Sequence, residues 1–346
     1  MAVTYKIEDK AKKQIIAAGP PPDLADYELA GERSEGTKAF IIWMLFILIA
    51  SIGLSVNPYT MGFGIGIFVW WLLSCIVYFM IAPRMVLRRL RMHGAEYEIT
   101  AKKQPRLKTL LAKASAMLGL GEPEGFLVNE QIPQIRILGG KNNSFIVITQ
   151  GAVDLLQPSE LDTLVLRCLV HARQGHVRRL MLLQFVNDTP PAVRIFAWPV
   201  VLYARMLSFN WHDMAAQTAD RLTLLLMKNH KLLLSALLKL HASTDPIMQA
   251  SNITPQDVDN YIRQGSFIGL EGAEISTQYR IGSAVHENPY LEERMQALNR
   301  WADSDEYDAA LEKLAAARAG KTPTVDTSAN GAAGAAPNSP TAANKP

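Results

Sequence analysis

Two long apolar runs dominate the first quarter of the chain. Residues 39–56 and 61–82 contain no charged side chain, and only the short uncharged segment 57–60 separates them. At 1.5 Å per residue, helices over these runs measure about 27 and about 33 Å, which matches a hydrocarbon core of about 30 Å. Uncharged runs of this length are rare in soluble cores, so the pattern predicts a transmembrane helical hairpin over residues 39–82.

Basic side chains flank both ends of this hairpin. The positive-inside rule places such flanks in the cytoplasm. We therefore predict a multi-pass protein of the inner (plasma) membrane, in contact with the lipid bilayer, with both termini and the folded domain in the cytoplasm. The flanking residues are Lys10, Lys12, Lys13, Arg33 and Lys38 before the first run and Arg84, Arg88, Arg89 and Arg91 after the second.

The remainder of the chain divides by composition. Residues 1–38 carry mixed charges and a Gly-Pro-Pro-Pro break, which predicts a short cytosolic arm. Residues 83–318 alternate between periodic apolar segments and polar connections, which is typical of a folded domain of ordinary size. Residues 319–346 are mostly Ala, Gly, Pro, Ser, Thr and Asn, so they cannot bury a core and are expected to form a disordered tail.

Short β-type patterns and longer helical patterns share the domain. Apolar residues at i, i+3 and i+4 predict helices, whereas short β-branched runs bounded by turn residues predict strands. We therefore expect an α+β, mostly helical fold with a small β-sheet. The expected helices cover 107–118 and 151–156, and the expected strands cover 126–128, 134–138 and 144–149.

A further, longer helix is predicted to begin near Ser159, which has a spacing similar to a capping box, and to continue through His176. On such a helix His171 lies about 140° from His176 and beside Arg167 and Arg178, so its ring is expected to face solvent. The opposite stripe is expected to face the core and comprises Leu161, Leu164, Val165, Cys168, Leu169, Ala172 and His176.

Composition and charge narrow the classes of function. The chain has 346 residues, of which 49% are hydrophobic and 19% charged, and its mean hydropathy is +0.06. A net charge of +3 without a basic stripe interleaved with aromatic residues excludes a nucleic-acid partner. Cys75 and Cys168 have no CxxC spacing and are predicted to lie in membrane and cytosol respectively, so we expect no disulfide.

Three segments of the domain, in this order, resemble the HtpX-like, CAAX-prenyl-protease type of membrane zinc metallopeptidase. They are VITQGAVDLLQPSELDTLVLRCLVHARQGHVRRL at 147–180, AAQTADR at 215–221 and NPYLEERMQAL at 288–298. The resemblance covers roughly residues 107–300. It implies a zincin-like metallopeptidase domain that follows the paired membrane helices.

The catalytic residues of that family do not carry over. Its HExxH motif falls on Ala-Arg-Gln-Gly-His, where Ala172 replaces the first zinc ligand, Arg173 replaces the general base and only His176 is kept. In its ExxxD motif Ala216 replaces the third ligand, while Asp220 is kept. A catalytic zinc normally needs three protein ligands. We therefore expect these positions to be degenerate, with no catalytic residue, no metal and no cofactor.

An active zinc enzyme with unusual ligands is the alternative. Its ligands would be His171, His176, His212 and Asp220, which requires a π-bulge to bring the first two rings together. Without metal, His176 is interpreted as a core histidine, and Asp220 and Arg221 are candidates for a structural ion pair.

The resulting functional prediction is a pseudoprotease that binds an unidentified protein or peptide; a structural subunit of a membrane complex is the second alternative. Residues 192–208 are apolar but contain two arginines and a proline. This pattern fits a helix that lies at the membrane interface, one buried in the domain, or one that spans the membrane. The family resemblance implies that a peptide adds to an edge strand. The residues expected to form that strand are Ser144, Phe145, Ile146, Val147, Ile148 and Thr149.

Overall fold

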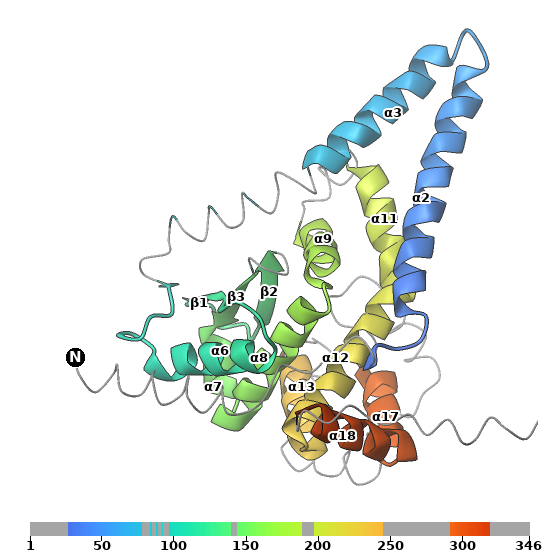
Figure 1. Ribbon diagram of the computed structural model, residues 1–346. Helices are drawn as coiled ribbons and strands as arrows, with labels where there is room; N and C mark the ends of the chain where they lie inside the picture. The colour runs from blue at the N-terminus through green and yellow to red at the C-terminus, as the bar shows by residue number, and fades with distance from the viewer. Residues whose placement is uncertain are drawn as a thin grey trace, which may run out of the picture.

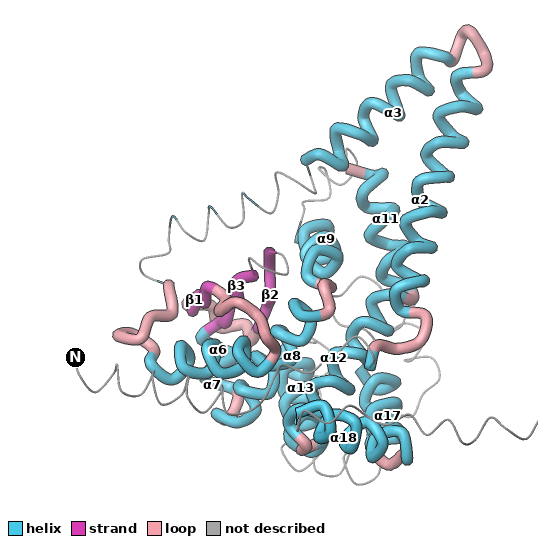
Figure 2. The backbone as a smooth tube through the Cα atoms, viewed as in Figure 1, coloured by secondary structure: helices cyan, strands magenta, loops and turns pink. Residues whose placement is uncertain are grey.

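Helices form most of the described chain, together with one three-stranded sheet (Figure 2). This confirms the expected mostly helical fold with a small sheet. The computed structural model describes residues 27–77, 97–139, 144–188, 197–244 and 291–318, with the single residues 84, 88 and 92. The predicted tail (319–346), the end of the second apolar run (78–82) and residues 245–290 lie outside the described residues.

Helices α2 (Glu32–Ser55) and α3 (Met61–Ile76) pack against each other, and their joined ends extend away from the rest of the molecule, whereas the start of α2 packs against α11 and α12 (Figure 1). Gly64 allows their close approach, because a Cβ there would lie 2.5 Å from the carbonyl oxygen of Ser51. α2 is long and apolar enough to cross a membrane, whereas the described part of α3 is shorter. α2 begins at Glu32, so residues 32–38 of the predicted arm are helical.

The sheet contains β1 (Glu124–Val128), β2 (Ile135–Gly139) and β3 (Ser144–Thr149), close to their predicted positions. Its order is β1-β3-β2, with β3 parallel to β1 and antiparallel to β2. The prediction that Ser144–Thr149 is an edge strand is therefore wrong. The chain places β3 between the two earlier strands, so both of its hydrogen-bonding edges are already paired.

Helix α8 lies at the centre of the domain, where it packs against α6, α12, α13 and β2. Its predicted apolar stripe is buried. The capping box uses Gln157 and Glu160 rather than Ser159. The helix bounds are α6 (Pro105–Met117), α7 (Gln150–Leu155), α8 (Pro158–Arg173), α9 (Val177–Asp188), α11 (Trp198–Phe209), α12 (Trp211–Met227), α13 (His230–Thr244), α17 (Leu291–Ala302) and α18 (Asp305–Arg318).

Helix α11 contains the described part of the apolar segment 192–208. It packs against α2, α3 and α9 (Figure 1). Trp43 of α2 donates from Nε1 to the carbonyl oxygen of Pro199 at 2.7 Å and stacks on Tyr203 at 4.7 Å between ring centroids. Val200 and Leu207 are fully buried, and Val201, Leu202 and Met206 only partly, so one face of the described helix packs into the protein.

Candidate functional site

A helix break at Gly175 shapes the site. α8 ends at Arg173, Gly175 has a φ of +78°, and α9 starts at Val177. The N–H of His176 donates to the carbonyl oxygen of His171 at 3.0 Å, and that of Gly175 donates to Ala172 at 3.1 Å. These two bonds are the Schellman arrangement in which glycine ends a helix. The prediction of one helix through His176 is therefore wrong.

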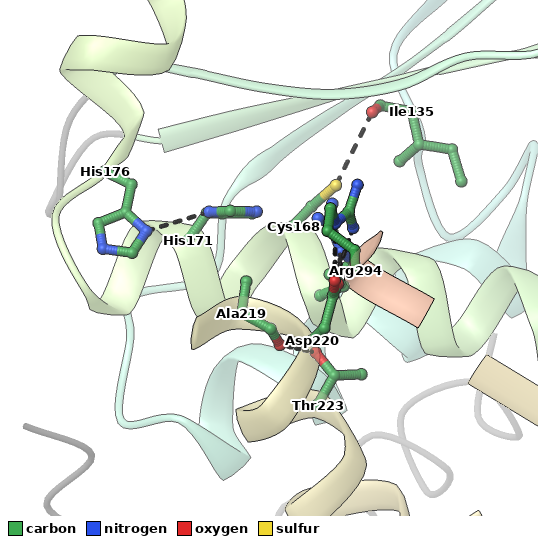
Figure 3. A network of polar contacts seen from close by, with 9 residues as sticks. Ile135, Cys168, His171, His176, Ala219, Asp220, Thr223 and Arg294 are labelled. Carbon is green, nitrogen blue, oxygen red and sulfur yellow. Dashed lines mark hydrogen bonds and ion pairs between the residues drawn. The ribbon is translucent and has the colours of Figure 1, made fainter. Parts of the chain in front are cut away.

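This break brings the two histidines together. The Nδ1 atoms of His171 and His176 lie 3.1 Å apart, and both side chains are buried (Figure 3). The prediction of a solvent-facing His171 was wrong, because it assumed that the helix continues. The interpretation of His176 as a buried histidine is confirmed, although it lies just outside α8.

Sequence reasoning missed the partner of His176. Glu32, at the start of α2, is 2% exposed, and its Oε1 lies 2.6 Å from Nε2 of His176. The hydroxyl of Thr218 donates to the other carboxylate oxygen at 2.5 Å. One signal was present in the sequence: Glu32 shares a helix face with the small residues Gly36 and Ala39, which are also buried.

Proton positions follow from this chain of contacts. An ionised carboxylate can only accept, which assigns a proton to Nε2 of His176. Burial, followed by the charge of Arg167, holds the pKa of His171 well below its usual value, so its ring is neutral near pH 7. When both rings are neutral, Nδ1–H of His171 donates to Nδ1 of His176 and leaves Nε2 of His171 as an acceptor.

A second buried cluster surrounds Asp220 of α12. Arg167 of α8 donates from Nε to Oδ1 at 2.5 Å, and Arg294 of α17 donates to Oδ2 at 3.0 Å from Nε and 2.6 Å from Nη2 (Figure 3). The expected structural ion pair is therefore present at Asp220, whereas the guanidinium of Arg221 lies over the ring of Trp301, 5.1 Å from its centroid. Asp220, in the segment 215–221, thus contacts Arg294, in the segment 288–298, so two of the three segments that carry the resemblance meet here.

The donor set does not fit a zinc ion of the kind that the resemblance implies. Both oxygens of Asp220 are engaged by arginines. Ala172 and Ala216, at the positions that the resemblance aligns with two zinc ligands, are buried and have no metal-binding group in their side chains. Within the described ranges, no group of three or more His, Cys, Asp or Glu side chains is placed to hold a metal ion.

A cavity of about 110 Å³ lies between β2 and helices α8, α9 and α12. His212, at the start of α12, is 6% exposed and faces it. Burial, with the charges of Arg294 and Arg167, lowers the pKa of His212 to about 3, so its ring is neutral. The lining residues are Ile135, Arg136, Ile137, Arg167, Cys168, His171, Leu180, Leu183, Gln184, His212 and Ala216.

Among the described residues, no strand pairs with the outer edge of β2, which borders this cavity. Thr149 donates its N–H to the carbonyl oxygen of Gln134 at 3.1 Å, which marks a hydrogen-bonded pair. In an antiparallel ladder such pairs alternate, so the N–H and C=O groups of Ile135 and Ile137 point away from β3. Both residues line the cavity, where the weak thiol donor Cys168 lies 3.8 Å from the carbonyl oxygen of Ile135.

The comparisons with known proteins identify one distant relative. No protein-family model matches the chain, and no solved structure is detectably similar to it. The chain is 24% identical over 220 residues to the plastoglobule-localized metallopeptidase 48, chloroplastic, of Arabidopsis thaliana, and the match covers 60% of each protein. The chain thus spans less than two thirds of this relative. The similarity supports a relationship with a metallopeptidase-like family.

Proposed function

We propose that the chain is a degenerate, HtpX-like membrane protein that binds an extended peptide or partner segment without cleaving it. The main support is that two buried hydrogen-bonded clusters lie where the resemblance implies a metal centre. His176 is bound by Glu32, Asp220 is bound by two arginines, and alanines stand at both lost ligand positions.

The surface of α2 and α3 supports membrane insertion. Large apolar side chains such as Phe46, Ile49 and Phe63 are more than half exposed along both helices. Soluble proteins rarely expose so continuous an apolar surface. We propose that both helices cross the inner membrane and that the domain and both termini lie in the cytoplasm. A reporter fused after Pro346 that is active only in the periplasm would contradict this topology.

The outer edge of β2, rather than β3, is the proposed peptide site. An extended segment beside Ile135 and Ile137 would complete their outward hydrogen bonds, which is the usual mode of strand addition. The cavity would receive one of its side chains or its end. β3 contributes by fixing the register of β2.

The active-enzyme alternative has one observation in its favour. The 3.1 Å between the Nδ1 atoms of His171 and His176 is close to the roughly 3.3 Å that separates two imidazole ligands on a tetrahedral zinc ion. A third ligand is missing from the described residues. A direct hydrogen bond explains the same distance without a metal.

Zinc stoichiometry together with cleavage assays separates the two functions. We expect detergent-purified protein to contain far less than one zinc per chain and to leave an unfolded substrate such as casein intact. One zinc per chain, with casein cleavage that His171→Ala or His176→Ala abolishes, would show that the pseudoprotease proposal is wrong.

A further inference from the structure

His212 presents an unused polar group to the cavity. Its side chain is more than nine-tenths buried and lines the wall formed by α12. Across the described residues, no hydrogen bond is assigned to either of its ring nitrogens. A buried imidazole normally has a partner. Its neutral ring therefore offers one N–H donor to a group inside the cavity.

Arg167 adds donors on the facing helix, α8. Its side chain is 15% exposed and uses only Nε to bind Asp220. Its two terminal nitrogens donate no hydrogen bond to any residue that the structure describes. Because Asp220 is also bound by Arg294, the cluster of one carboxylate and two guanidinium groups keeps an excess positive charge on this side.

The charged side chains that line the cavity are all positive. Arg136 and Arg167 line it, and its lining includes no Asp or Glu. Gln184 accepts from Nε of Arg136 at 3.0 Å, which holds that guanidinium beside the outer edge of β2. A volume of about 110 Å³ accommodates several water molecules, or a carboxylate with a short stem.

We propose that this cavity binds a carboxylate of an extended peptide, with the terminal nitrogens of Arg167 and a ring N–H of His212 as donors. This inference rests on the proposed function, since the outer edge of β2 holds the backbone of the same peptide. Guanidinium groups favour carboxylates through charge-assisted hydrogen bonds. The carboxylate comes either from an acidic side chain or from the C-terminus of the peptide.

Three matched hexapeptide pools test the proposal with the full-length protein immobilised in detergent. Four positions of each pool are randomised over uncharged residues. The first pool has an internal Glu and an amidated end, the second an internal Gln and a free C-terminal carboxylate, and the third an internal Gln and an amidated end. We expect the first or the second pool to be captured at least tenfold more than the third, and which of them is enriched identifies the source of the carboxylate.

Two variants locate the effect. Arg167→Gln should reduce the preference over the third pool to less than twofold, and chemical denaturation of the variant in detergent checks that it is folded. Arg178→Gln, an exposed change on α9, should leave the preference intact. Equal capture of all three pools by the wild-type protein would overturn the carboxylate inference and leave peptide binding standing. Capture of no pool would overturn the proposed function and this inference together.

Discussion

The two polar clusters beside the cavity differ in where their residues come from. Asp220, Arg167 and Arg294 all lie in the part of the chain that resembles the metallopeptidases, and both arginines donate to Asp220. His176 also lies there, but its buried partner Glu32 comes from the start of α2. The family-like charged cluster is therefore complete within the domain, whereas the histidine cluster depends on the helix proposed to enter the membrane.

This difference has a mechanical consequence. Glu32 connects α2 to the turn between α8 and α9 through His176, and to α12 through Thr218. Gly36, one turn further along α2, leaves room for the guanidinium of Arg179. The carboxylate thus fastens the apolar helix pair to the domain at the site itself, and perturbing either cluster tests a different part of the molecule.

The largest effect is expected for Asp220→Asn. Removing this charge leaves Arg167 and Arg294 without a counter-ion in a buried position, and breaking a buried ion pair typically costs about 3–5 kcal/mol. Chemical denaturation in detergent measures the change, with the exposed Asp303→Asn as the control. A loss of less than about 1 kcal/mol would show that the cluster is solvated rather than buried.

Acid should destabilise the histidine side of the cavity. Burial lowers the pKa of His171 and of His212 in the folded protein, whereas the unfolded value is about 6.5. Below pH 6.5 the unfolded chain therefore binds more protons, so this stability is complete above pH 6.5 and is lost as the pH falls toward the folded values. Each ring contributes up to about 1.4 kcal/mol per pH unit.

Unfolding free energies at pH 7.5, 6.5 and 5.5 measure this loss. At pH 5.5 the two rings together account for roughly 3 kcal/mol. His212→Gln should remove about half of the pH dependence over this interval. An unchanged slope in that variant would mean that His212 is protonated or solvent-accessible in the folded state.

Glu32→Gln tests the histidine cluster with a smaller expected effect. The amide keeps the shape and one acceptor oxygen, so the cost is that of a charge-assisted hydrogen bond, about 1–3 kcal/mol. Glu35→Gln on the same helix changes only an exposed pair with Lys38 and a long 3.4 Å contact from the Asn210 amide, so it should leave the stability unchanged. Equal responses of the two variants would show that Glu32 does not hold α2 to the domain.

Local and distant information explain which parts of this structure could be predicted. The strands and α6 follow from periodicity and from turn residues such as Gly119, all of which act within a few residues. The position of β3 in the sheet depends on which strands pair, which no local pattern specifies. The same holds for Glu32, whose partners lie 144 or more residues away in the chain, as the pairing of Glu32 with His176 shows.

The helix break at Gly175 is an intermediate case. Its local signal is present in the sequence, because a glycine near the end of an apolar stripe indicates a helix end. The neighbouring apolar repeat, however, continues to His176 and predicts one unbroken helix. The structure resolves the competition: both Schellman bonds form, and the two histidines meet. The apolar periodicity is misleading at this point, because the stripe of buried residues continues to His176 across a helix break.

Gly175→Ala is the smallest and most local test of that conclusion. With φ at +78° and no neighbouring atom within 4 Å of a Cβ, the cost is backbone strain alone, about 1–2 kcal/mol. Gly121→Ala is the matched control, since a Cβ there also meets nothing and its φ lies outside the left-handed region. The strain also disfavours the turn that brings His176 to Glu32, so Gly175→Ala combined with Glu32→Gln should cost less than the sum of the two single changes. Full additivity would mean that the helix break and the carboxylate act independently, and that Gly175 serves only to end α8.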